Sequence, residues 1–168
     1  KKFKFFSLRY FNVLGADKHF RYGPIGLNLN SFSNNLYKSI ISGQDFKIFG
    51  NDHKTLDGTP VRDFIHVDDL ANIHFESLKY LIKNKENQIC NCGYGKGYSI
   101  EQVIKTLLKN KEMNLNYSFS KKRPGDISYM VADIKKLNKI LNWKPKYSNL
   151  KKMIFSEFKW RNKLTNNQ

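Results

Sequence analysis

The sequence predicts an α/β fold built as one domain of 168 residues. Short apolar runs of strand length alternate along the chain with segments whose apolar residues recur at the three- to four-residue spacing of a helix. With 40% hydrophobic and 14% aromatic residues, the chain can bury a sizeable core, and its composition is not that of a disordered protein. The sequence contains no internal repeat and no linker that would separate two full domains.

The first elements are a strand, a long loop, a helix and a second strand. Residues 3–11 form a dense aromatic run, which predicts a strand covered on both faces. Residues 12–31 are rich in Gly, Asn and Pro and predict a long loop, which makes them a candidate binding loop because long loops in compact domains are usually functional. A helix is predicted over 32–41, ending at Gly43, and a short strand over 46–49.

A polar turn region, a strand and a longer helix follow. The turn covers residues 50–60 and the strand 61–67. We expect Asp68 or Asp69 to cap the next helix, because a carboxylate accepts hydrogen bonds from the free N–H groups of a first helical turn. Another strand is predicted at 88–92, where the apolar run ends in glycines.

The last third of the chain has the clearest helical signal. Ser99 and Gln102 form a capping box, and the helix after it has its apolar residues at helical spacing: Ile100, Val103, Ile104, Leu107 and Leu108. A strand at 115–119 and the loop "SKKRPGD" precede a short helix that Asp133 is expected to cap. The final helix is expected to begin near Ser148.

The chain is strongly basic, with 30 Lys plus Arg against 14 Asp plus Glu and a formal charge of +16. Such a charge raises nucleic acid as a partner, because a basic face gains affinity by releasing counterions from phosphates. The lysines are scattered among asparagines, as in "LIKNKENQ", and this indicates solvated surface charge rather than a groove. A basic nucleic-acid-binding module therefore remains an alternative, and the favoured prediction is no nucleic-acid partner.

The sequence indicates a cytoplasmic protein with reduced thiols and no membrane anchor. Cys90 and Cys92 point to one face of a predicted strand, too close along it for a relaxed disulfide, so we expect buried, reduced thiols. No stretch approaches the roughly 20 consecutive apolar residues of a membrane helix, and the opening "KKFKFFSLRYF" does not resemble a signal peptide. Because Lys1 lies directly before a strand-like run, we expect the chain to be a piece of something longer.

Two sequence features are predicted to be structural. The glycines of "GYGKG", at 93–97, lack the ending of a P-loop and the spacing of a dinucleotide fingerprint, so a strand-to-helix turn with positive φ is favoured. His66 is predicted to be a satisfied structural residue, and the other histidines show no metal-binding spacing with it. No Ser/His/Asp or Cys/His arrangement is present in the sequence pattern.

Polar residues at strand ends and in loops suggest a site for an anionic ligand that carries a sugar. Asn12 follows the first strand, Arg62 lies near the start of the third, and Arg123 and Asp126 lie in "KKRPGD". An arginine fork can bind phosphate oxygens while an aspartate accepts from ribose hydroxyls. The structural alternative, equally favoured by the chemistry, pairs Arg62 with one of the nearby aspartates Asp63, Asp68 and Asp69.

Several longer stretches resemble one known family. They are "LRYFNVLGA", "IFGNDHKTLDGTPVRDFIHVDDLA", "NCGYGKGYSI" and "RPGD", followed by "AD" and "LNWKP". Together, in this order and spacing, they resemble the C-terminal half of the UDP-glucose 4-epimerase family, within the extended short-chain dehydrogenase/reductases. The insert "NDHKTLDGT" favours this family over relatives such as dehydratases, in which the corresponding loop is usually shorter. Another nucleotide-sugar dehydratase or epimerase of the superfamily remains the enzyme-class alternative.

The resemblance implies a doubly wound NAD-binding (Rossmann) sheet with a small α/β substrate-binding domain. Residues 3–11 and 61–97 would contribute the last strands of that sheet and a helix, and residues 12–60 and 98–168 would belong mainly to the substrate domain. It also implies NAD, a UDP-hexose substrate, hydride transfer at the sugar C4, and a homodimer for the complete enzyme. The missing N-terminal half, in cis or in trans, would hold the glycine-rich fingerprint and the catalytic YxxxK pair. No catalytic residue is therefore expected in this chain, and the strands at 3–11 and 88–92 should expose apolar faces.

The resemblance also implies roles for particular residues. Asn12 would hold the pyrophosphate region of the ligand and Arg62 would clamp it, with Lys47 and Phe49 at the uracil and Arg123 and Asp126 on phosphate and ribose. Tyr10 would lie near the nicotinamide, and Met130 stands where the family gates N-acetylated sugars. Which of Asn30, Asn34 and Asn35 meets the ligand is left open by the sequence, as is the acceptance of N-acetylated hexoses.

Overall fold

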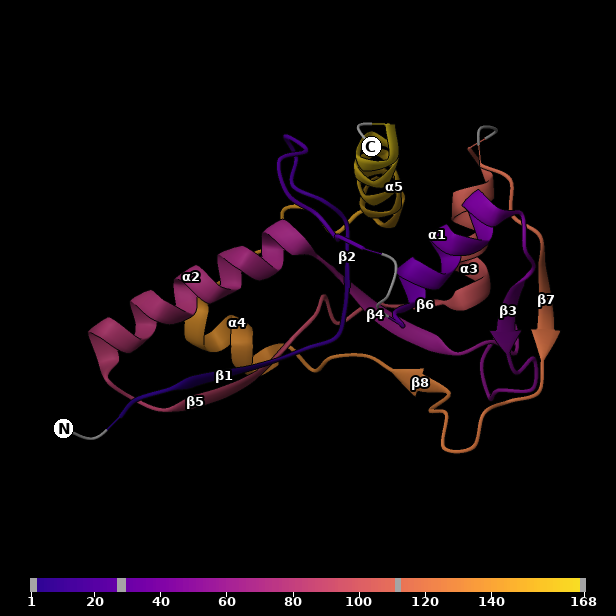
Figure 1. Ribbon diagram of the computed structural model, residues 1–168. Coiled ribbons are helices and arrows are strands. Elements are labelled where there is room, and N and C mark those ends of the chain that lie inside the picture. Colours follow the sequence, from indigo (N-terminus) through magenta and orange to yellow (C-terminus); the bar gives the residue numbers. More distant parts are fainter. Residues whose placement is uncertain (1–2, 27–29, 111–112, 167–168) are drawn as a thin grey trace.

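The protein has the α/β architecture predicted from its sequence, in the computed structural model shown in Figure 1, which describes residues 3–26, 30–110 and 113–166. Its strands form three small groups. Strand β1 (Phe6–Tyr10) pairs in parallel with β5 (Gln88–Cys92), and β3 (Phe46–Phe49) pairs in parallel with β7 (Tyr117–Ser120). Between them, β4 (Val61–His66) is flanked by β2 (Asn12–Leu14), β6 (Gly97–Ser99) and β8 (Tyr129–Met130).

The pairing register of β4 brings distant parts of the chain together. Its carboxyl-terminal part pairs in parallel with β2, with Asn12 opposite Phe64, while its first residues pair with β6 and β8. Arg62 therefore lies opposite Tyr98 on one side and Met130 on the other. The short strands β6 and β8 and the three residues of β2 were not predicted from the sequence, because elements of two or three residues have no detectable periodicity.

Five helices pack on these strands in the described ranges. They are α1 (Phe32–Ser42), α2 (Val67–Asn84), α3 (Ile100–Leu108), α4 (Lys135–Leu141) and α5 (Leu150–Asn166). Ser31 caps α1, which ends at Gly43 in the left-handed conformation, and the predicted capping box of Ser99 and Gln102 is present on α3. Helix α5 begins at Leu150, later than the predicted start near Ser148.

Two expected caps were wrong in detail. The N-cap of α2 is His66 rather than Asp68 or Asp69: its Nδ1 accepts a hydrogen bond from the Asp68 amide at 3.1 Å. The cap position of α4 is Ile134, although the carboxylate of Asp133 still accepts from the Lys135 amide at 3.0 Å. The structural role predicted for His66 is thus confirmed, because a neutral ring nitrogen can satisfy an unpaired helix amide as a carboxylate can.

The buried side chains form two clusters. The larger one, which includes Phe64, Met153 and Phe158, joins α1, α3 and α5 to β3 and β4. The smaller one includes Ile65, Ile73 and both cysteines, and lies between the β1–β5 pair and helices α2 and α4. Figure 1 shows these last elements at one end of the molecule, and α1, α3, β3 and β7 at the other. The division of the chain into NAD-domain and substrate-domain ranges stays a prediction.

Apolar residues are exposed at the β1–β5 end, as expected. Phe3 is 85% exposed and Ile89 44% exposed, and the outer face of α2 presents Phe75, Leu78 and Ile82 to solvent. The prediction of one strand over residues 3–11, covered on both faces, is wrong: only Phe6–Tyr10 is a strand, and it is half-buried to exposed. Across the ranges described, no helix has the length and apolar character needed to cross a membrane.

Candidate binding site

A cavity of about 520 Å³ lies where β2, β3, β4 and α1 meet the loop between β7 and β8. Six of the residues predicted to bind the ligand line it: Asn12, Lys47, Phe49, Arg62, Arg123 and Asp126. They come from four separate segments of the sequence, which the parallel pairing of β2 with β4 and of β3 with β7 brings together. This volume is within the usual range for a small-molecule pocket.

Arg62 is held in this cavity by three groups. Its Nη2 donates to the Asp126 carboxylate at 2.8 Å, and its Nη1 donates to the backbone oxygens of Val61 at 2.8 Å and Ile127 at 2.7 Å. Burial lowers the pKa of Arg62, while the adjacent carboxylate of Asp126 acts in the opposite direction. The guanidinium remains charged, because arginine keeps its proton in proteins.

The aspartates that follow Arg62 in the sequence have other partners, so the ion pairs considered for them were wrong. Asp63 is fully buried and accepts from the backbone amides of Tyr94, Gly95 and Ala132, which fixes the glycine turn after β5. Asp69 is also buried and accepts from the Tyr94 hydroxyl at 2.6 Å. Both carboxylates are therefore structural, and Gly95 has the positive φ, +66°, that the glycine motif predicted.

Asp126 is shared between two arginines. Besides Arg62, it binds Arg123, whose Nη2 lies 3.0 Å from the other carboxylate oxygen. The Arg123 guanidinium carbon also lies 4.6 Å from the centre of the Phe49 ring. One side of the cavity thus combines two cations, one carboxylate and one aromatic face, which suits a ligand that carries phosphate, hydroxyl groups and a planar ring.

Lys47 is fixed at the edge of the cavity. Its Nζ donates to Asp45 at 2.7 Å and to the Ser118 hydroxyl at 2.8 Å, across the β3–β7 pair. The hydrogen bond from Lys47 lowers the pKa of Asp45. The Lys47 ammonium is thus paired with a carboxylate, as the Arg123 guanidinium is with Asp126.

The three asparagines that the sequence left undecided are separated by the structure. Asn30 and Asn35 line the cavity, and the Asn35 amide donates to the Asn30 oxygen at 2.9 Å. Asn34 is buried on the opposite side of α1, where its oxygen accepts from Arg161. Asn30 and Asn35 are therefore the two that a ligand in this cavity can reach.

Two predicted site residues lie outside the lining of this cavity. Tyr10 is at the end of β1, 55% exposed, with its ring centre 6.2 Å from that of His74 on α2. Met130 lies on β8, paired with Arg62 and 37% exposed. The structure thus gathers the residues expected to bind a nucleotide and leaves Tyr10 at the β1–β5 end of the molecule.

Several residues of the site were missed by the sequence analysis. Phe32 and Ser39 line the cavity with Asn35, three and four positions apart on one face of α1, a spacing that would have revealed them once Asn35 was placed. The buried ring of His53 bridges the Phe49 oxygen and the Ser128 hydroxyl, both at 3.1 Å, and so supports two sides of the cavity. No sequence spacing indicated this contact.

Neither the cysteines nor the histidines form a centre for a metal. Within the described part of the chain, no three His, Cys, Asp or Glu side chains converge as metal ligands would. Cys90 and Cys92 are free thiols, both buried, as predicted. Burial raises the pKa of Cys92 to about 12, so it is protonated at neutral pH.

The sequence is similar to several proteins of one kind. UDP-glucose 4-epimerase of Lactobacillus helveticus is 37% identical over 158 residues, which are 94% of this chain and 48% of the relative. The enzyme of Azospirillum brasilense is 35% identical over 94% of this chain and 45% of its own length. The chain therefore spans about half the length of the curated relatives that it matches.

Solved structures agree with this result. A UDP-glucose 4-epimerase from Stenotrophomonas maltophila, with bound NAD and formylated UDP-arabinopyranose, matches the whole chain with a TM-score of 0.91 at 27% identity, over 50% of its own length. The enzyme of Bifidobacterium longum, in complex with NAD⁺ and UDP, matches 98% of the chain at 34% identity with a TM-score of 0.84, over 49% of its own length. The fold predicted from the resemblance, that of the Rossmann-type short-chain dehydrogenase/reductases, is confirmed by these neighbours.

A family model completes the comparison. Residues 1–93 match the model of the NAD dependent epimerase/dehydratase family. They include β1, β2 and β4 and more than half of the residues that line the cavity, so the match covers the strands that position the site. The chain belongs to the NAD dependent epimerase/dehydratase family.

Proposed function

We propose that this chain is the nucleotide-sugar-binding half of a UDP-glucose 4-epimerase, which works with an N-terminal NAD-binding half supplied in cis or in trans. One observation carries the proposal. Asn12, Phe49, Arg62, Arg123 and Asp126, which the family resemblance assigns to the ligand, line a single cavity although they come from distant parts of the sequence. Relatives that are 35–37% identical to this chain are named UDP-glucose 4-epimerases and are about twice as long.

The geometry suggests how the cavity would hold the nucleotide. Arg62 and Arg123 would neutralise the diphosphate, since each can present two parallel N–H donors to phosphate oxygens. Asp126 would exchange part of its contact with the arginines for the ribose hydroxyls. The uracil would lie against Phe49, where the Arg123 guanidinium now stacks, so Arg123 would turn from the ring toward the phosphate when the ligand binds.

The residues present fit one end of NAD only. In doubly wound sheets the dinucleotide lies at the carboxyl ends of the parallel strands, and here Tyr10, at that end of β1, is exposed. Tyr10 would contact the nicotinamide, whereas the pyrophosphate loop and the catalytic Tyr and Lys would come from the N-terminal half. NAD would supply the acceptor and donor of the hydride at the sugar C4, and this chain would hold the nucleotide while the keto sugar turns.

The test combines binding and product analysis. The chain alone is expected to bind UDP weakly and to produce no epimerised sugar. After addition of the N-terminal half of a relative, UDP-galactose should be converted to UDP-glucose. A dehydrated keto sugar as product would instead favour a dehydratase of the same family, and epimerisation by the chain alone would contradict the assignment of catalysis to the other half.

The same titration separates the nucleic-acid alternative that the charge of +16 raises. A nucleic-acid module would bind single- or double-stranded oligonucleotides with an affinity that falls steeply with salt, and would not respond to UDP. An epimerase half should bind UDP in 0.2 M salt and leave the oligonucleotide free.

Further parts of the proposal concern the complete enzyme. We infer a cytoplasmic location from the buried reduced thiols, and a homodimer from the family resemblance. The intact mass of the native protein tests the arrangement: a value near twice 19.8 kDa means that both halves lie in one chain, whereas 19.8 kDa means a separate NAD-binding partner. Met130 would be the residue that controls the acceptance of N-acetylated sugars, and its flexible side chain is compatible with a larger or a smaller substituent.

A further inference from the structure

Helix α5 carries a buried ion pair that contacts neither the cavity nor solvent. Glu157 is 1% exposed and Arg161 3% exposed, and one carboxylate oxygen of Glu157 accepts from the arginine Nε at 3.0 Å and Nη2 at 2.7 Å. Taking two charges out of water is costly, and apolar residues of similar volume often stabilise a fold equally well. What the ion pair adds is direction, because hydrogen bonds fix angles that apolar contacts leave free.

The carboxylate holds the segment that follows β2. The second oxygen of Glu157 accepts from the Gly15 amide at 3.0 Å, and the hydroxyl of the neighbouring Ser156 accepts from the Ala16 amide at 3.2 Å. Strand β2 has only three residues and pairs with β4 over that length. The position of its first residue, Asn12, therefore depends on how α5 anchors the chain immediately after it.

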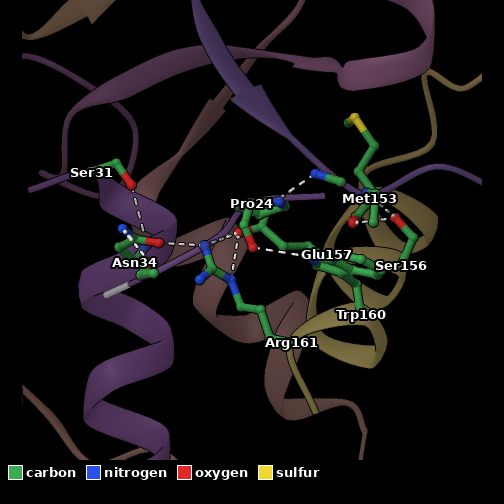
Figure 2. Close-up of polar contacts among 11 residues, drawn as sticks. Pro24, Ser31, Asn34, Met153, Ser156, Glu157, Trp160 and Arg161 are labelled. Atoms are coloured by element: carbon green, nitrogen blue, oxygen red, sulfur yellow. Dashed lines mark hydrogen bonds and ion pairs between the residues drawn. The ribbon is translucent and has the colours of Figure 1, made fainter. Parts of the chain in front are cut away.

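The guanidinium holds α1. Arg161 donates from Nη2 to the side-chain oxygen of Asn34, and its central carbon lies 5.3 Å from the centre of the Tyr37 ring. Figure 2 shows Arg161 between Glu157 and Asn34, with Ser156 and Trp160 on the same helix. Asn34 is the residue directly before Asn35, so the buried face of α1 is fixed by Arg161 while its other face lines the cavity.

We propose that the Glu157–Arg161 pair is a positioning device for the ligand: it fixes β2 and α1 relative to each other so that Asn12 and Asn35 meet the diphosphate–sugar part of the nucleotide together. This inference rests on the proposed function. The two residues act through the backbone and through Asn34, and do not touch the ligand themselves. The Phe49 end of the cavity is built on β3 and the β7–β8 loop, whereas the hydrogen bonds described for the pair reach Gly15 and Asn34.

The test compares two ligands on a variant that lacks the ion pair. Glu157→Leu with Arg161→Met replaces the pair by apolar side chains of similar volume, a change that often leaves a buried ion-pair site stable, and it removes the contacts of the pair with the Gly15 amide and the Asn34 oxygen. The affinity for UDP is expected to fall about tenfold or more, the effect of one lost hydrogen bond to a charged group. Uridine, which lacks the diphosphate and is held at the Phe49 end, should bind as it does to the unchanged protein.

A matched control removes an ion pair elsewhere. Glu76→Gln with Lys79→Gln removes an exposed pair of α2, whose side chains lie 2.8 Å apart, and should leave the affinity for both ligands unchanged. Circular dichroism and thermal unfolding establish that each variant is folded before titration calorimetry with UDP and an NMR titration with uridine.

The outcomes are distinct. If the unchanged protein does not bind UDP, the proposed function fails. If it binds UDP and the folded apolar variant binds UDP equally well, or loses UDP and uridine in parallel, the positioning role is refuted. Should the apolar variant not fold, Asn34→Ala replaces it: it removes the link from Arg161 to α1, together with the hydrogen bond from the Asn34 amide to the Gly26 backbone oxygen, and keeps the contact of Glu157 with the Gly15 amide. A selective loss of UDP affinity then supports the role, and unchanged UDP affinity refutes it.

Discussion

Replacing Arg62 by alanine should separate the binding role of this residue from its structural one. In the free protein the Arg62 side chain is 13% exposed, and its guanidinium binds Asp126 and two backbone oxygens. Its removal leaves Asp126 paired with Arg123, so no carboxylate becomes isolated in the cavity. We expect the free energy of unfolding to fall by only about 1–2 kcal/mol, as hydrogen bonds on partly accessible groups are lost.

The effect on UDP binding should be larger. If Arg62 contacts the diphosphate through two charge-assisted hydrogen bonds, each contributing about 1.5 kcal/mol or more, its loss costs about 3 kcal/mol. This corresponds to a UDP affinity roughly 150-fold lower, at 1.4 kcal/mol per factor of ten. Arg62→Lys keeps the charge but not the planar fork, and should lose about tenfold.

The assay is titration calorimetry with UDP on the two variants, next to the unchanged protein and Arg9→Ala. Arg9 is an exposed arginine of β1 outside the cavity, so its removal makes the same change in net charge at a different place. An Arg62→Ala protein that is folded and binds UDP within about threefold of the unchanged protein would refute the assignment of Arg62 to the phosphate. An equal loss in Arg9→Ala would show that net charge, not the site, controls affinity.

Three further predictions concern the structure around the site. Asp69→Ala removes the acceptor of the Tyr94 hydroxyl and of two backbone amides. In urea unfolding it should lower the free energy of unfolding by about 4 kcal/mol, and Asp69→Asn should lower it by about 2 kcal/mol. A loss below about 1 kcal/mol in Asp69→Ala would contradict this prediction. Gly58 has a φ of +75°, and the Cβ of an alanine there would lie 2.1 Å from the Asn51 backbone oxygen. The melting temperature of the Gly58→Ala protein should therefore drop by several degrees, and an unchanged melting temperature would contradict this. Burial raises the pKa of the Cys92 thiol to about 12, so a thiol reagent at about pH 8 should modify Cys90 and Cys92 only in denaturant. Stability should also decline as the pH rises above about 9, because the thiol of the unfolded chain ionises first. Rapid reaction of the folded protein with the reagent would refute this reasoning.

The sequence was informative wherever one segment carries its own pattern. The capping box at Ser99 and the apolar spacing after it predicted α3, and the glycine at 43 predicted the end of α1. Helix α2 was predicted, but its cap was misassigned because carboxylates are common caps and histidine is not. Local chemistry thus determined these elements, and an uncommon local choice was the source of the error.

Contacts between distant segments could not be predicted in the same way. The sequence suggested neighbouring aspartates as partners of Arg62, but its carboxylate comes from Asp126, 64 positions away. The alternation of side chains along β4 explains why. Asp63 lies on the opposite face of the strand from Arg62, and its carboxylate accepts hydrogen bonds from the turn after β5. The residues of the cavity were found by family resemblance, since no spacing within a single segment relates Asn12 to Phe49 or Asn35.

The pairing of β1 with β5 has a consequence for the synthesis of this protein. Phe6 pairs with Gln88, so about 80 residues must be added before the first strand can meet its partner. At about 5–20 residues per second, the aromatic strand emerges several seconds before β5 has been made. During that interval its apolar side chains lack the cover that β5 and α2 give them in the folded chain. A nascent chain of this kind is therefore a natural client for a chaperone that binds extended aromatic segments at the ribosome.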